Sequence, residues 1–160
     1  MQITTCTINS LVRAIITGLG TGAGGLGPGT DLNCQVVPSF RDSEKVNSLP
    51  KIAVDQATNS GFPIGLGEIG KGREMDIAVH IWARNMGQGR ELGDKVWDIL
   101  LFKTNYGVFP IYDYSTTTPT QVATGQTFLD ERGTIAEEDE EDNGYVRLIL
   151  ICPILTHKPA

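Results

Sequence analysis

The most regular pattern along the chain is an alternation of apolar and more polar residues between positions 73 and 83. A period of two places successive side chains on opposite faces of a β-strand. One face of this strand would be wholly apolar, with Met75, Ile77, Val79 and Ile81. The other would carry His80 beside Trp82. We therefore expect a strand with one face on the core and the other only partly in contact with water.

Two other stretches have the spacing of an amphipathic α-helix. Between residues 90 and 103, four apolar residues recur at i, i+4, i+7 and i+8 and form one stripe. This stripe consists of Leu92, Val96, Ile99 and Leu100. A second stripe, near the N-terminus, consists of Leu11, Val12, Ile15 and Ile16. We expect the first helix to begin at Leu11, with Asn9 or Ser10 as its N-cap, and to end at Gly18.

Shorter β-branched and aromatic stretches predict the remaining strands. They are residues 34–37, 50–57, 108–112, 121–129 and 145–152. The last of these is apolar on both faces apart from Arg147, which is typical of a central strand. A connecting loop is expected over residues 58–72. The element order predicts a single α+β domain over residues 1–160, with a mainly antiparallel (mixed) β-sheet, two α-helices packed on one face, and long loops.

A glycine-rich segment, residues 18–30, follows the first helix. Its glycines are Gly18, Gly20, Gly22, Gly24, Gly25, Gly27 and Gly29. Such a composition loses much backbone entropy on folding, so we expect a flexible loop, and a candidate docking segment for a partner. Residues 20–25 formally match the GxGxxG pattern, but that motif needs a strand before it and a helix after it to bind a pyrophosphate. Here a helix precedes the glycines, which argues against nucleotide binding.

The net charge of −6 comes from one short run of acids. The run consists of Glu137, Glu138, Asp139, Glu140, Glu141 and Asp142. Without it, 13 acids balance 13 bases, and no basic stripe for gripping phosphates is left. An unbroken acidic block also lacks the alternating ligands and central glycine of a calcium loop. We expect an acidic hairpin loop over residues 136–143, between two strands that are antiparallel neighbours, and a solvated or electrostatic role for it.

The residues that could carry chemistry are few and scattered. Cys6, Cys34 and Cys152 are an odd number without metal-ligand spacing, which favours buried thiols over a disulfide framework or a zinc site. His80 and His157 are the two histidines, and the chain contains no nucleophile-elbow motif. The sequence therefore predicts neither an enzyme nor a bound cofactor or metal. Its longest apolar run, residues 148–155, is too short to cross a bilayer.

One stretch resembles a known family. Residues 76–83 read DIAVHIWA and residues 91–100 read ELGDKVWDIL, with a short polar turn between them. This strand–turn–helix is similar to the middle of tail-terminator and tail-completion proteins of tailed bacteriophages. The likeness covers about a quarter of the chain closely, and the long glycine-rich segment departs from the family pattern.

The resemblance implies a structural virion protein located in the tail or neck. Such proteins form hexameric rings that cap the tail tube and join it to the head. The expected partners are further copies of the chain, a tail tube protein and a head-neck or connector protein, with DNA passing through the channel. In such a ring, the acids of residues 137–142 would face the channel and repel DNA, so that it slides without sticking.

Three alternatives remain open at this point. A head–tail connector or neck protein would have similar size and composition. A small nucleotide-binding enzyme would need a strand before the glycine-rich segment. A monomeric adaptor or peptide-binding module would differ from a ring protein in its mass in solution.

Overall fold

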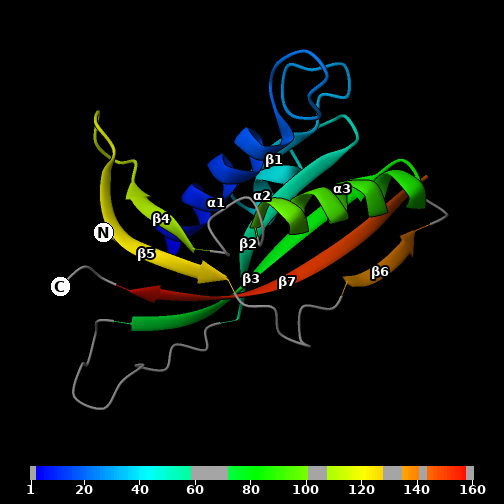
Figure 1. The fold of residues 1–160 in the computed structure, drawn as a ribbon. Helices are drawn as coiled ribbons and strands as arrows, with labels where there is room; N and C mark the ends of the chain where they lie inside the picture. Colours follow the sequence, from blue (N-terminus) through cyan, green and yellow to red (C-terminus); the bar gives the residue numbers. More distant parts are fainter. Residues whose placement is uncertain (1–2, 59–71, 101–107, 128–134, 141–143, 158–160) are drawn as a thin grey trace.

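The computed structural model describes residues 3–58, 72–100, 108–127, 135–140 and 144–157 (Figure 1). These residues form an α+β fold in which helices α1 and α3 cover one face of a seven-stranded mixed sheet. The elements are α1 (Ile3–Leu19), β1 (Gln35–Val37), α2 (Phe40–Ser43), β2 (Lys51–Thr58), β3 (Gly72–Ala83), α3 (Met86–Asp98), β4 (Val108–Asp113), β5 (Thr120–Thr127), β6 (Ile135–Glu140) and β7 (Tyr145–His157). The predicted fold class is confirmed. The loop expected over residues 58–72 lies, apart from its ends, outside the described residues.

Strand β7 is central in the sheet, as its apolar sequence predicts. The strand order is β1-β2-β3-β7-β5-β4, and β6 also pairs with β7. Along one side β7 pairs with the whole of β3, while along the other it pairs first with β6 and then with β5. β7 runs past the predicted end to His157, because Pro153 lies between the last β6 pair at Leu150 and the first β5 pair at Ile154. A proline at this gap interrupts neither of those two ladders.

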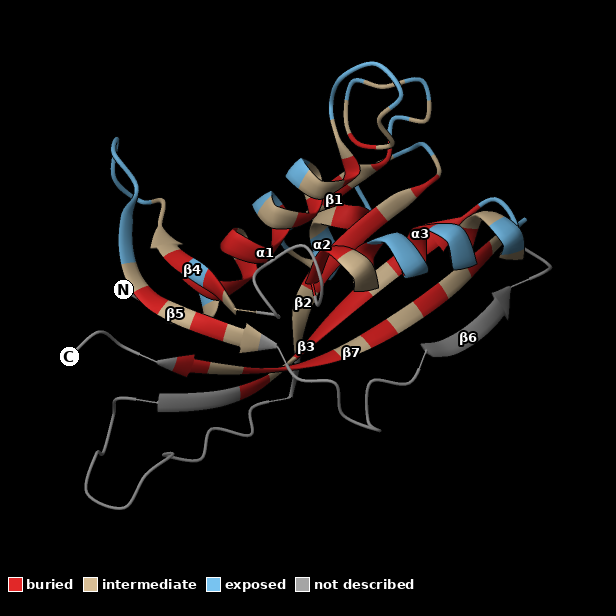
Figure 2. Cartoon of the chain, in the orientation of Figure 1, coloured by how far each residue is buried: buried red, intermediate tan, exposed pale blue. Residues whose placement is uncertain are grey.

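The face of the sheet toward the helices forms the core. Ile81 of β3 lies between Ile52 and Leu148 in the ladder, and the next aliphatic row follows two residues along each strand. Directly paired residues point to the same face of the sheet. The apolar residues of neighbouring strands are therefore aligned in rows on the core face. Figure 2 shows the resulting alternation of buried and partly exposed residues along β7, whereas β3 is buried at most of its positions. The core side predicted for residues 73–83 is confirmed, because its four aliphatic and methionine residues are at most 1 % exposed.

Helix α1 begins eight residues earlier than predicted, at Ile3 instead of Leu11. The polar N-terminal sequence is compatible with a helix because Thr7 satisfies its hydroxyl locally, donating to the Ile3 carbonyl at 2.8 Å. Ser10 is therefore inside the helix and is not its cap. The helix ends at Leu19, and Gly20, with φ +84°, follows it. A left-handed residue just after the last turn is a common helix terminator and favours glycine.

Helix α3 also begins earlier than predicted, at Met86, since Asn85 is its N-cap. The Asn85 side chain accepts a hydrogen bond from the Gln88 amide at 2.9 Å. The Gln88 side chain in turn accepts from the Arg84 amide at 2.9 Å. This reciprocal arrangement resembles a capping box, whose spacing is visible in the sequence as Asn-x-x-Gln. The apolar stripe predicted for this helix is confirmed, with all four members buried.

The acidic run is not the loop that we predicted over residues 136–143. Residues 136–140 belong to β6, which pairs antiparallel with residues 145–149 of β7. In β6 the backbone of the acidic residues forms ladder hydrogen bonds with the apolar strand β7. An edge strand tolerates charged residues because one of its sides is unpaired. Gly144, with φ +73°, leads directly into β7. The other part of the prediction is confirmed, because β5 is an antiparallel neighbour of β7.

Candidate functional site

The glycine-rich segment joins α1 to β1 and folds back against the end of α1. Its backbone closes through hydrogen bonds from Leu26 to the Leu19 carbonyl (2.9 Å) and from Gly27 to the Gly20 carbonyl (2.9 Å). A β-carbon on Gly27 would lie 2.8 Å from that same Gly20 oxygen, which explains why glycine is needed there. The segment is a loop, as expected, with internal hydrogen bonds that the glycine count did not predict. Its docking role stays a prediction.

Gly18 differs from the other glycines because it lies within α1. A β-carbon at Gly18 would lie 2.5 Å from Cγ1 of Ile99, so the residue permits close contact between α1 and the end of α3. Gly18 also lines an open pocket on the exposed side of α1. The structure therefore connects the predicted docking segment to a groove, but through this one residue alone.

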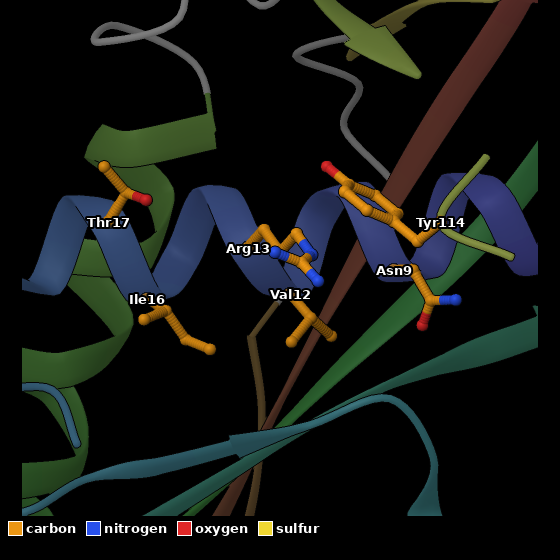
Figure 3. Close-up of a pocket in the computed structure, with 6 residues that line it drawn as sticks. All are labelled: Asn9, Val12, Arg13, Ile16, Thr17 and Tyr114. Atoms are coloured by element: carbon orange, nitrogen blue, oxygen red, sulfur yellow. The ribbon is translucent and has the colours of Figure 1, made fainter. Parts of the chain in front are cut away.

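The groove consists of two adjoining pockets along α1, and we call it the α1 groove. The first has a volume of ≈ 550 Å³ and is lined by Asn9, Val12, Arg13, Ile16, Thr17 and Tyr114. Figure 3 shows Asn9, Val12 and Ile16 along one side of α1, Tyr114 along the other, and Arg13 between them. The second pocket, ≈ 470 Å³, shares three of these residues and extends over β4. Its remaining lining residues are Ser10, Ala14, Gly18, Ile99, Phe109, Pro110 and Tyr112.

Helix α1 is fixed to β4 at the base of this groove. Ser10, 5 % exposed, accepts a hydrogen bond from the Tyr112 amide at 3.0 Å. Two residues away along β4, Pro110 has no amide to donate. The outer edge of β4 is thus closed to another strand at these two positions, while the surface above it remains open.

Arg13 carries the positive charge of the α1 groove. It is exposed, and its guanidinium carbon lies 4.0 Å from the centroid of the Tyr114 ring. Arg13 forms no ion pair with any described residue. The ion pair that the described residues contain joins Lys45 to Asp42, outside the groove. A guanidinium over an aromatic ring keeps its N–H donors, and these can bind a carboxylate in two-point geometry.

The opposite face of the sheet carries a second cluster, of which the sequence predicted only the neighbouring His80 and Trp82. The Phe40 ring of α2 lies 5.3 Å from the His80 ring and 5.5 Å from the Trp82 ring. Arg147 lies over Phe40 at 5.1 Å and donates to Nδ1 of His80 at 2.9 Å. The Phe40 amide donates to Asp55 at 3.0 Å. These contacts hold α2 on the outer face, which explains how Trp82 comes to be only 6 % exposed.

The cations of this outer-face cluster are used for packing. Lys51 lies 5.2 Å from the Trp82 ring centroid and donates to the Ser43 carbonyl at 3.0 Å. Arg147 is held by His80 and the two aromatic rings. The arrangement therefore favours a structural role. Helix α2, which supplies Phe40, left only a weak sequence signal, Ser39 as an N-cap, that could have predicted the cluster.

The described residues that could carry chemistry are buried thiols and isolated carboxylates. All three cysteines are free and buried, as predicted. Burial raises the pKa of Cys34 to about 12, and burial with the nearby Asp76 raises the pKa of Cys152 to about 12. Hydrogen bonds from Ser115 lower the pKa of the exposed Asp113. No group of three metal-ligating side chains occurs within the part of the chain that the structure describes.

The acidic strand lies at the opposite end of the molecule from the α1 groove. Glu137 pairs with Leu148 near the start of β7, whereas β5, which carries β4, pairs with Ile154 to His157 at its end. At roughly 3.3 Å per residue, the eight residues from Leu148 to Thr156 span about 26 Å. Figure 1 shows β6 at one end of the sheet and β4, with the start of α1, at the other. The acidic strand and the α1 groove are therefore not brought together in one chain.

The chain matches no protein-family model and no curated protein at a significant level. Among the described residues, no helix is long and apolar enough to span a bilayer.

Proposed function

We propose that the protein is a structural subunit of a tailed-phage virion, a ring-forming tail terminator that caps the tail tube and joins it to the head. Its partners would be other copies of itself, most simply as a hexamer, the tail tube protein and a neck protein. DNA would pass through the channel without specific binding. The protein would act in the tail or neck of the virion and not as an enzyme.

The observation that supports this proposal most is the arrangement of β3 and α3. The sequence resemblance rests on these two elements, and they pack directly on one another at the middle of the sheet. β3 lies between β2 and β7, and α3 is capped by Asn85 immediately after β3 ends. A β-carbon at Gly89 of α3 would lie 3.5 Å from the β-carbon of Ala83 in β3, and it would overlap a methyl group of Leu148 in β7. The residues that carry the resemblance therefore lie in two elements that pack against each other.

The surfaces of the subunit also fit a ring protein. The α1 groove is open and partly apolar, and the acidic strand lies at the far end of the sheet. A subunit whose two ends differ can associate head to tail, and such contacts close into rings when the rotation allows it. A monomeric adaptor would not need two different surfaces at opposite ends.

Electron microscopy of negatively stained tail tubes tests the proposal. Purified protein is added to tubes that lack heads, and tube ends are imaged with and without it. We expect a ring at one end of each tube and no further tube growth when tube protein is then supplied. Rings that bind isolated heads but never tubes would favour the neck-protein alternative. Absence of binding to both would contradict the proposal as a whole.

A further inference from the structure

We propose that the α1 groove receives strand β6 of a second copy of this chain. This inference rests on the proposed function, since it identifies the two surfaces through which neighbouring subunits meet in the ring. The charge of the groove, its lining and the position of the two surfaces in the fold all favour this occupant.

The charge at the centre of the groove indicates an acidic occupant. Arg13 is stacked on Tyr114 at 4.0 Å and has no carboxylate against it among the described residues. A guanidinium has five N–H donors and no acceptor, so its outward edge is suited to a carboxylate. The pockets on both sides add apolar surface from Val12, Ile16 and Phe109. A segment that combines acids with small or aliphatic residues fits such a lining.

Strand β6 has that composition and carries the charge imbalance of the chain. Its sequence is Ile135-Ala136-Glu137-Glu138-Asp139-Glu140. The run to which these acids belong accounts for the whole net charge of −6, because the other 13 acids are balanced by 13 bases. Within the described residues, β6 is paired along one side only, with β7. It is therefore the acidic element of the fold, and its second edge pairs with no described strand.

The topology makes this contact one between two molecules. The β6 end and the β5 end of β7 are separated by about 26 Å along the strand at the usual rise per residue. A chain cannot place its own β6 in its own groove without breaking the β6–β7 ladder. Two complementary surfaces at opposite ends of a subunit give a heterologous, head-to-tail contact, which is the kind that forms rings.

This proposal changes the role expected for the acidic run. Glu137 to Glu140 would lie at the contact between subunits instead of facing the channel. The two roles differ in consequence: a contact residue affects assembly, whereas a channel residue affects passage of DNA through rings that are already assembled.

Paired charge reversals test the inference. One variant carries Arg13→Glu, and the other carries Lys at all four acidic positions of β6. Each alone should raise the concentration at which half of the chains are monomeric by about tenfold or more, measured by mass photometry. Arg41→Glu makes the same charge change as Arg13→Glu at an exposed position of α2. It is the matched control for Arg13→Glu and should leave assembly unchanged. Thermal melts establish that each variant is folded; if the Lys variant is not, Gln and Asn at the same positions replace it, and the same loss is expected.

Mixing the two reversed variants gives the sharper result. In a mixture, every groove can meet a strand of opposite charge, so rings should form again from two chains that fail alone. If Arg13→Glu rings remain as stable as the wild type, or if mixing restores nothing, the groove does not receive β6. In both cases a wild-type ring on the tail tube would leave the proposed function intact. A wild type that forms no ring at all would contradict both proposals.

Discussion

At the scale of single residues, the fold depends on a few side chains whose role the sequence does not reveal. Ser10 reads as a helix cap because serine favours that position. In the structure it is inside α1 and accepts a hydrogen bond from Tyr112, which lies 102 residues away. No local pattern encodes a bond of that separation. The aliphatic residues of β3, by contrast, could be assigned to the core from their period alone.

Replacing Ser10 by Ala should weaken the attachment of α1 to β4 and lower the free energy of unfolding. The variant leaves the Tyr112 amide without its acceptor, and an unsatisfied amide of this kind costs about 1–3 kcal/mol. Urea unfolding measures the loss in the free energy of unfolding. Thr17→Ala, at an exposed position of the same helix, is the control and should change stability by less than about 0.5 kcal/mol. Equal stability of the two variants would show that the Ser10 bond contributes nothing.

The buried thiols predict how stability depends on alkaline pH. Burial raises the pKa of Cys34 and Cys152 to about 12, whereas a thiol in the unfolded chain has its ordinary pKa of 9.0. A raised pKa in the folded state gives stability that is complete below pH 9 and is lost as pH rises from 9 toward 12. The loss is about 1.4 kcal/mol per pH unit for each thiol.

A variant with Ala at Cys34 and Cys152 separates this effect from other alkaline titrations. Urea unfolding at several pH values between 8 and 11 should give a shallower fall in stability for the variant than for the wild type. The comparison uses slopes, because the substitutions also change packing. Parallel slopes would mean that the thiols do not differ between the folded and unfolded states.

At the scale of elements, periodicity predicted the type of each long element but not its ends. The stripe of α3 gave its buried face correctly, while its start was set by the Asn85 cap. The signal for the start of α3 was in the sequence, as Asn85 three residues before Gln88. The signal for the end of α1 was there too, as Gly20 after Leu19. Charge misled the prediction for β6, since a run of acids is usually solvated but can pair as an edge strand.

Two glycines of α3 test how this helix packs on the sheet. Gly89→Ala should destabilise the protein by about 1–3 kcal/mol, because its β-carbon would overlap Cδ1 of the buried Leu148. Gly93→Ala should stabilise it by about 0.5–1 kcal/mol, because its β-carbon would lie 3.9 Å from Ile81, an ordinary contact, and alanine favours a helix. Thermal unfolding of both variants makes the comparison. The same direction of change in both would mean that α3 is not held against β7 as described.

At the scale of the whole molecule, the sequence predicted the fold class and the central position of β7, but not the strand order. The position of β6 and β5 end to end along β7 depends on pairing between distant segments, which local patterns do not specify. The α1 groove was missed for the same reason, since it joins residues of α1 to residues of β4 and α3. The predicted glycine and acidic segments were visible in composition, but the separation of the acidic strand from the α1 groove follows from the pairing along β7.

The mass of the assembled protein shows whether identical subunits form a ring that caps the tail tube. Native mass spectrometry of the purified chain, of 17.3 kDa, is recorded alone and after release from tail tubes. A homomeric ring should give a closed oligomer, most simply of about six chains, on the tubes. A chain that remains a 17.3 kDa monomer at high concentration, and is not retained by tubes, would contradict it.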